Sequence, residues 1–139
     1  MNRNIHITDN LLYENTANGI GGLGVGNDRF NVVANNFCRR NGNSGIHAIN
    51  GRDNIITGNI CIDNSQSELG RYSGISILDS KLTMVSANRS GTEGDNPMQK
   101  FGIEEQGNSD LNVTVDNICE GNAIGGIGIA GKATNLIYS

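Results

Sequence analysis

Three polar side chains occupy equivalent positions of a recurring pattern and could together do acid–base chemistry. His47, Ser76 and Glu104 each lie two residues after a glycine that opens an alternating apolar segment. A histidine and a carboxylate can exchange protons with a substrate, or remove a proton next to a carboxyl group. We therefore predict His47 and Glu104 as catalytic residues, with Ser76 between them as a binding residue. The alternative is that all three are ordinary solvated side chains of a β face.

Two long polar segments, 65–73 and 89–101, precede two of these strands and are expected to rise beside them. They carry Arg71 and Lys100, either of which could hold a carboxylate, and Tyr72, which could stack on a ring. We predict these three as substrate-binding residues. The same loops also bring Glu68, Glu93 and Asp95.

Glu105 follows the proposed column and breaks the apolar alternation. Strict alternation would turn its side chain inward, at the position that Ala48 and Ile77 hold in other segments. A buried, unpaired carboxylate is costly. Either Glu105 is a functional acid, or the strand ends or bulges there and the carboxylate faces water. The second interpretation is favoured, and Glu105 remains among the substrate-binding candidates.

The elements that must position these residues come from an internal repeat. The pattern N-h-C-x-x-N, where h is apolar, occurs at 36–41, 59–64 and 117–122, with a leucine variant at 10–15 and a degenerate copy from Asn88. Each copy except the first follows a Gly anchor by 14 or 15 residues, and the anchors are Gly22, Gly45, Gly74, Gly102 and Gly126. One arc of fixed length and one variable loop per turn predict a parallel β-solenoid of about five coils. The crossover preference makes it a right-handed β-helix.

Stacked coils explain the abundant asparagine. Equivalent residues in neighbouring coils lie about 4.8 Å apart, so an amide side chain can bond to the copies above and below it. The predicted ladder consists of Asn10, Asn36, Asn59, Asn88 and Asn117. A second ladder would contain Asn31, Asn54, Asn112 and Asn135. Cys38, Cys61 and Cys119, with Ser90 between the last two, are expected to form an interior column of small thiols.

Composition excludes several classes of function. With 139 residues, 36% of them hydrophobic, and no Trp, the chain has little material for one bulky core. A net charge of −4 gives no reason to expect nucleic-acid binding, and no apolar run is long enough to span a membrane. No signal peptide is visible. The cysteines lack zinc-site spacing, and Gly21-Gly-Leu-Gly24 lacks the Asp of a calcium repeat, so no metal or other cofactor is expected.

Both ends of the sequence read as cut coils without a capping helix. We therefore expect residues 1–139 to be a single β-helix domain that is a piece of a longer solenoid. Uncovered coil edges invite pairing with other strands, so end-to-end stacking or a homo-oligomer is expected.

The stacking motif, and above all residues 99–122, resembles the right-handed β-helix repeats of the pectate-lyase-like superfamily. The resemblance spans nearly the whole chain and implies a polysaccharide partner, because that superfamily contains polysaccharide lyases, glycoside hydrolases, epimerases and phage tailspikes. It also implies an extracellular or virion-associated location. The Asp-Pro-His-Asp motif of the epimerases is absent, as are the paired-Asp and Gly-His-Gly motifs of polygalacturonases, so no active site can be carried over.

The sequence therefore predicts a carbohydrate-active or carbohydrate-binding module for an acidic polysaccharide, of lyase, epimerase or depolymerase type. The alternative is a non-enzymatic structural module, such as a tailspike shaft or a stacking assembly unit. A column of Arg29, Arg52 and Lys81 could grip an anionic polysaccharide. Because Asp28, Asp53 and Asp79 accompany it, mutual neutralisation of turn charges is favoured.

Overall fold

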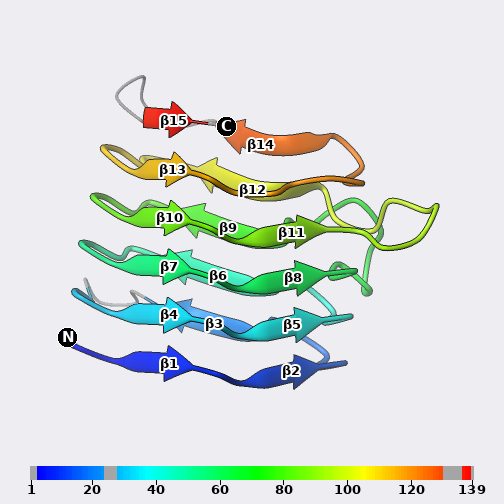
Figure 1. Ribbon diagram of the computed structural model, residues 1–139, viewed down its shortest axis with the longest axis horizontal. Coiled ribbons are helices and arrows are strands. Elements are labelled where there is room, and N and C mark those ends of the chain that lie inside the picture. The colour runs from blue at the N-terminus through cyan, green and yellow to red at the C-terminus, as the bar shows by residue number, and fades with distance from the viewer. Residues whose placement is uncertain (1–2, 24–27, 130–135, 139) are drawn as a thin grey trace.

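The computed structural model describes residues 3–23, 28–129 and 136–138 of the chain. Its strands form three parallel sheets that run along a solenoid (Figure 1). The first sheet contains, in order, β1 (His6–Thr8), β4 (Val32–Ala34), β7 (Ile55–Thr57), β10 (Met84–Ser86), β13 (Val113–Val115) and β15 (Leu136–Tyr138). The second contains β2 (Leu11–Tyr13), β5 (Phe37–Arg39), β8 (Ile60–Ile62) and β11 (Arg89–Gly91). The third contains β3 (Ile20–Leu23), β6 (Ile46–Ile49), β9 (Ile75–Leu78), β12 (Phe101–Gln106) and β14 (Gly125–Ile129).

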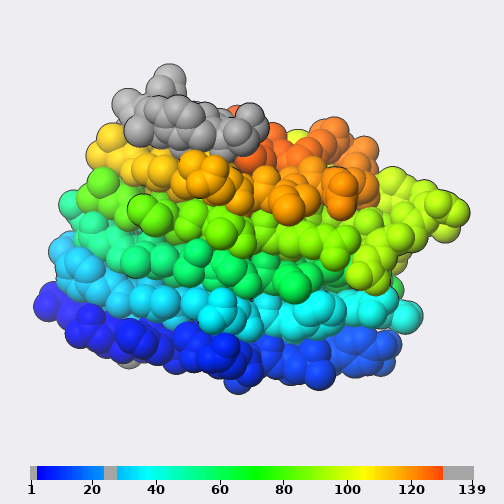
Figure 2. All heavy atoms as spheres, viewed as in Figure 1, coloured from blue at the N-terminus to red at the C-terminus, as the bar shows by residue number. Residues whose placement is uncertain are grey.

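The coils are right-handed and number about five, as the repeat predicts. In Figure 1 the first two strands of a coil cross the front from left to right, and the third returns behind them while the chain climbs. Figure 2 shows the coils as stacked bands, from which one yellow-green segment projects on the right. No α-helix occurs in the described residues, so none there is long enough to cross a membrane.

The core is a narrow column of inward side chains, one or two from each strand. Alternation along the strands turns Ile46 and Ala48 of β6 inward, and Ile75 and Ile77 of β9 stack directly on them. The first sheet contributes the buried residues Val33, Ile56, Val85 and Thr114. Because each coil buries so little, the stacking of coils and not a central globular core holds the chain together.

The predicted asparagine ladder is confirmed, with one hydrogen-bonded step per coil. The Asn36 side-chain amide donates to Oδ1 of Asn59 at 3.0 Å, and Asn59 donates to Asn88 at 3.0 Å. Asn10 and Asn88 make the same bond to Asn36 and Asn117. The backbone N–H of each residue also donates to the next Oδ1. Nearly every polar group of the ladder is thus satisfied inside the solenoid.

A residue in the left-handed conformation precedes each ladder asparagine. The φ angles are 59° at Asp9, 57° at Asn35, 64° at Gly58, 53° at Ala87 and 54° at Asp116. This conformation turns the chain sharply between the first and second sheets. It is unfavourable for a residue with a side chain such as Ala87, so the ladder bonds must offset part of its cost.

A further ladder, which the sequence analysis did not identify, lies at the end of the second sheet. Asn15 donates to Asn41 at 2.8 Å, Asn41 to Asn64 at 2.9 Å, and Asn64 to Gln99 at 2.9 Å. The last Asn of the N-h-C-x-x-N pattern was the sequence signal for this ladder.

The predicted second ladder holds in part. The backbone N–H of Asn31 donates to the side chain of Asn54. In the fourth coil Thr83 stands where the ladder would have an asparagine, and its backbone N–H donates to the side chain of Asn112. Asn135 lies outside the described residues.

The predicted register of the first coil is wrong. Ile20 pairs with Ile46 and Leu23 with Ala48, with a shift between the two pairs, so Gly19 and not Gly22 is the equivalent of Gly45. Leu23 therefore takes the inward place assigned to Val25. A glycine-rich stretch has few side chains to mark its phase, and an extra residue is absorbed as an irregularity of the strand. Gly24 and Val25 themselves lie outside the described residues.

The interior cysteine column is confirmed. Cys38 pairs with Cys61, and Cys61 pairs with Ser90 on the other side. All three cysteines are free thiols. The hydrogen bond with Cys38, together with burial, raises the pKa of Cys61 well above its usual range, and burial raises the pKa of Cys119 to about 11. Cys38 and Cys61 are therefore small interior groups and Cys119 is partly buried, and the raised pKa values keep Cys61 and Cys119 protonated at neutral pH.

Candidate functional site

A partly open pocket of about 350 Å³ lies on the outer face of the third sheet. Its floor includes His47 and Ser76, from β6 and β9, and the loops before β9 and β12 supply Arg71, Tyr72 and Lys100. The structure thus brings together five of the residues that the sequence analysis selected. The lining is completed by the amides Asn18, Asn43 and Gln106 and the hydroxyls Ser44 and Ser73.

The proposed column is in register as expected. His47 pairs with Ser76, Ser76 with Glu104, and Glu104 with Gly128. His47 and Glu104 are therefore two rungs, or about 10 Å, apart. Half-burial in the pocket lowers the pKa of His47 below 6.5, so its imidazole is neutral at pH 7 and can accept a proton.

Glu104 lies deeper than the prediction of an outward column implied, because only 6% of it is exposed. The Ser73 hydroxyl donates to its Oε2 at 2.6 Å, and the Lys100 ammonium donates to Oε1. The returning loop before β12 carries Lys100 over the carboxylate and covers it. Both carboxylate oxygens accept hydrogen bonds within the chain. Glu104 therefore influences the pocket by positioning the Lys100 ammonium and the Ser73 hydroxyl.

The two loops brace one another at the rim of the pocket. The N–H of Lys100 donates to the Tyr72 carbonyl at 2.9 Å, and the N–H of Gly70 donates to the Met98 carbonyl at 2.8 Å. Arg71 pairs with Glu68 and lies 5.4 Å from the centroid of the Tyr72 ring. The hydrogen bond with Glu68 raises the pKa of Arg71 above its ordinary value. Arg71 and Tyr72 thus form one preassembled cationic and aromatic edge.

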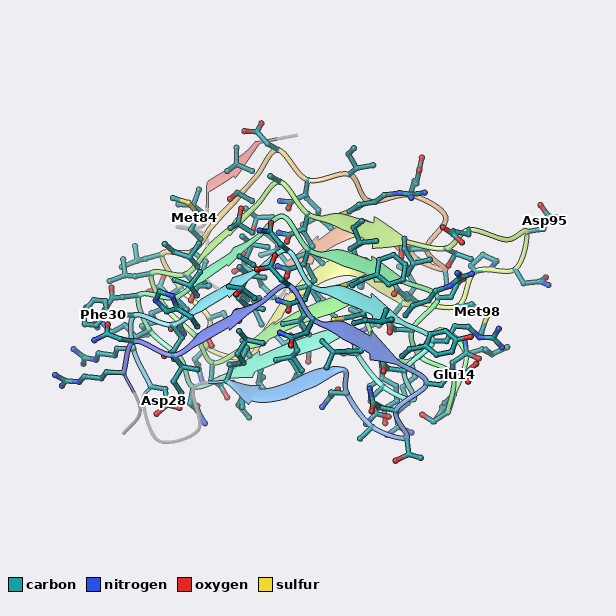
Figure 3. All side chains as sticks on the ribbon, turned by 60° about the horizontal axis from the view of Figure 1, so that its bottom comes forward. Glu14, Asp28, Phe30, Met84, Asp95 and Met98 are labelled. Carbon is teal, nitrogen blue, oxygen red and sulfur yellow. The ribbon has the colours of Figure 1, made fainter. Side chains whose placement is uncertain are left out.

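Glu93 and Asp95 do not join this pocket. Glu93 pairs with Arg39 at 3.1 Å, and Asp95 lines a separate depression of about 250 Å³ with Arg40 and Asp63. The segment from Thr92 to Met98 leaves the solenoid at the end of the second sheet, before the chain turns towards the third, as the position of Asp95 in Figure 3 shows.

The expectation that Glu105 faces water is wrong. β12 continues through Gln106, and Glu105 is wholly buried inside the coil between Ile77 and Ile129. Asn112 and Thr114 donate to its two oxygens, each at 3.1 Å. The polar residues of the next coil compensate the buried carboxylate. Glu105 is therefore outside the pocket, and its position gives no support to a substrate contact.

Sequence reasoning missed several pocket residues that do not stand out by type. Ser44 and Ser73 immediately precede the anchors Gly45 and Gly74, and Gln106 ends β12. The position of the two serines next to the anchor glycines could have predicted that they line the pocket. In the described part of the chain no three His, Cys, Asp or Glu side chains are grouped so as to hold a metal ion.

No protein-family model matches this chain, and no curated protein matches it either. Among solved structures, the chain is similar to the crystal structure of the enzymatically active domain of tailspike protein 2 from bacteriophage CBA120. The TM-score is 0.54 and the sequence identity 15%, over 84% of this chain and 20% of that one. The chain spans about a fifth of that domain's length, and the likeness shows a shared β-solenoid fold.

Proposed function

We propose that the pocket on the third sheet binds a saccharide unit of a polysaccharide. The observation that carries this proposal is the composition of the pocket: amides and hydroxyls surround a neutral His47 and the edge formed by Arg71 and Tyr72. Amide and hydroxyl side chains both donate and accept hydrogen bonds, as sugar hydroxyls do. The volume of about 350 Å³ falls within the range of small-ligand sites.

An acidic sugar fits the rim better than a neutral one. The Glu68 partner of Arg71 is exposed, with 58% of each side chain accessible, so a bound carboxylate can take its place on the guanidinium at little cost. Lys100 is held over Glu104, whose side chain is only 7% exposed, and keeps its charge directed towards the pocket. Arg71 would therefore hold the sugar carboxylate, with Tyr72 stacked on the ring.

The chemistry proposed for this arrangement is β-elimination: His47 takes the proton from the carbon next to the carboxylate, the electron pair forms a C=C bond, and the glycosidic C–O bond breaks, its oxygen taking a proton from water. His47 is neutral at pH 7 because it is half-buried, and so is ready to act as the base. A cation beside the carboxylate stabilises the charge that develops when the proton leaves. Glu104 and Ser73 then act as positioning residues for Lys100, in place of the direct catalytic role predicted for Glu104.

A structural module remains the second candidate, because both cations of the pocket already have carboxylate partners within the chain. Lys100 pairs with Glu104 and Arg71 with Glu68. Such pairing alone would brace the loops against the solenoid. In a purely structural shaft, holding the loops in place would be the whole role of these ion pairs.

An activity screen separates the two. The protein is incubated with acidic polysaccharides, and reducing ends and the absorbance of unsaturated uronates are measured. The enzymatic reading predicts a product that His47→Ala abolishes and His6→Ala leaves unchanged, since His6 is exposed on the first sheet. Failure of every substrate to react, or equal loss in both variants, removes the catalytic role and leaves the structural one.

A further inference from the structure

A column of basic residues lies on the corner between the third and first sheets. The backbones of Arg29, Arg52 and Lys81 are bridged in parallel on consecutive rungs, about 4.8 Å apart, and we call these three the basic column. Arg3 extends it on one side and Asp110 ends it on the other. Like charges stacked directly on neighbouring rungs repel one another.

The neighbouring carboxylates neutralise this column only in part. Arg52 pairs with Asp53, Nε to Oδ2 at 3.3 Å. Asp79 does not pair with Lys81; it accepts the backbone N–H of Asn108 at 2.7 Å. Within the described residues Lys81 has no carboxylate at ion-pair distance. The mutual neutralisation favoured from the sequence therefore holds for Arg52 and not for Lys81.

Arg29, like Lys81, has no carboxylate at ion-pair distance among the residues that the structure describes. Its Nε is buried and has no hydrogen-bond partner in the described part of the chain. The Nε of Arg39, at the opposite end of the coils, is also buried without such a partner, so the missing carboxylate and not the buried Nε sets Arg29 apart.

The cations at the opposite end of the coils are treated differently. Arg39 pairs with Glu93 at 3.1 Å, Arg40 with Glu14 at 3.6 Å and Arg89 with Glu120 at 3.9 Å. Figure 3 shows the two ends apart, with Asp28 and Phe30 on one side and Glu14 and Asp95 on the other. These three cations each have a carboxylate partner, whereas in the basic column Arg52 is paired and Lys81, within the described residues, is not.

Apolar side chains border the basic column. Phe30, Leu82 and Leu111 each follow a residue of that corner and are 49%, 40% and 47% exposed. They supply contact area for the apolar faces of a polymer whose charges lie on the column.

We propose that the basic column binds an extended anionic polysaccharide that lies along the solenoid axis, with acidic groups on successive rungs. A nucleic acid fits this spacing less well, because its backbone carries a charge about every 3.4 Å per strand whereas the rungs of the basic column are about 4.8 Å apart. Proteins that bind single strands also use several stacked aromatic side chains. This surface is separate from the pocket and does not depend on the function proposed for it.

The test measures binding of fluorescently labelled polygalacturonate to the whole chain at low and moderate salt, with dextran and single-stranded oligothymidylate as competitors. The variant R29Q/R52Q/K81Q is compared with R39Q/R40Q/R89Q, which loses the same charge from the paired end. We expect the first variant to weaken binding about tenfold and the second to leave it within about twofold. Dextran should not compete, oligothymidylate should compete poorly, and Tyr13→Ala, which changes an exposed side chain on the second sheet, should bind as the wild type does.

Equal weakening in both triple variants would show that the polysaccharide is attracted by positive charge in general and not by the basic column, and would overturn the proposal. So would the absence of binding by the wild type, or preference for oligothymidylate. Circular dichroism confirms folding. If R29Q/R52Q/K81Q does not fold, the single variant K81Q replaces it, because Lys81 is exposed. The proposal then requires that K81Q weakens binding more than R40Q does.

Discussion

The side-chain amide of Asn64 donates to Oε1 of Gln99 at 2.9 Å, across 35 residues of sequence. Gln99 therefore occupies the ladder position that asparagine holds in the coils below and above it. The chain leaves the solenoid after β11, forms the projecting segment, and rejoins the stack at this glutamine. Lys100 and the strand that carries Glu104 follow at once, so this one hydrogen bond fixes where the second pocket loop returns.

Gln99→Ala should lower the free energy of unfolding by about 2 kcal/mol or more, because it removes the acceptor of the buried Asn64 backbone N–H and of one Asn64 amide hydrogen. Chemical denaturation measures the change. Gln66→Ala, which alters an exposed glutamine in the neighbouring loop, is the matched control and should change stability by less than about 0.5 kcal/mol. Equal effects would show that the ladder position is not special.

Glu105→Ala should destabilise the fold by about 2 kcal/mol more than Glu105→Gln does. Alanine removes the acceptor of the Thr114 hydroxyl and of one amide hydrogen of Asn112, whereas glutamine keeps one acceptor and the volume. Thermal or urea unfolding of both variants provides the comparison. An alanine variant as stable as the glutamine variant would mean that the carboxylate is not needed by its neighbours.

His47 should titrate below pH 6.5 in the folded chain, because burial lowers its pKa. In the window between the folded pKa and 6.5 the unfolded chain binds the additional proton, so acidification through that window destabilises the fold. NMR titration of the imidazole measures the pKa directly. His47→Gln should remove that part of the pH dependence of stability; a titration at or above 6.5 would contradict the burial that the structure shows.

The cysteines should resist alkylation in the folded protein. Cys38 and Cys61 are wholly buried, and a pKa of about 11 leaves about one thousandth of Cys119 as thiolate at pH 8. Iodoacetamide should modify three thiols rapidly in urea and label the native chain at least about tenfold more slowly. Rapid labelling of the native chain would disprove the interior column, and fewer than three thiols in urea would indicate a disulfide.

The sequence was most informative where stacking demands identity. An asparagine that bonds to its own copy must recur, so Asn36, Asn59 and their equivalents predicted both the ladder and the register of the later coils. The column of His47, Ser76 and Glu104 followed from that register. The pocket loops could be assigned to this face because each of them precedes one of its strands.

Where the sequence misled, a position depended on a partner of another type. The buried Glu105 is bonded by Thr114, which stands where the preceding coil has Val85, and Gln99 stands in the place of an asparagine after an insertion. The first coil was misread because a Gly-rich run carries no alternation that marks Gly19 instead of Gly22. Such pairings need the spatial neighbour and cannot be read along the chain.

The proposed glycan pocket is tested most directly by equilibrium binding with matched double variants. Acidic oligosaccharides are titrated into the wild type, into H47A/Y72A, and into H6A/Y13A, which removes the same two side-chain types from exposed positions on the other two sheets. We predict an oligosaccharide that binds the wild type and H6A/Y13A equally and binds H47A/Y72A at least about tenfold more weakly. Equal affinity of all three proteins, or no binding by the wild type, would contradict the account.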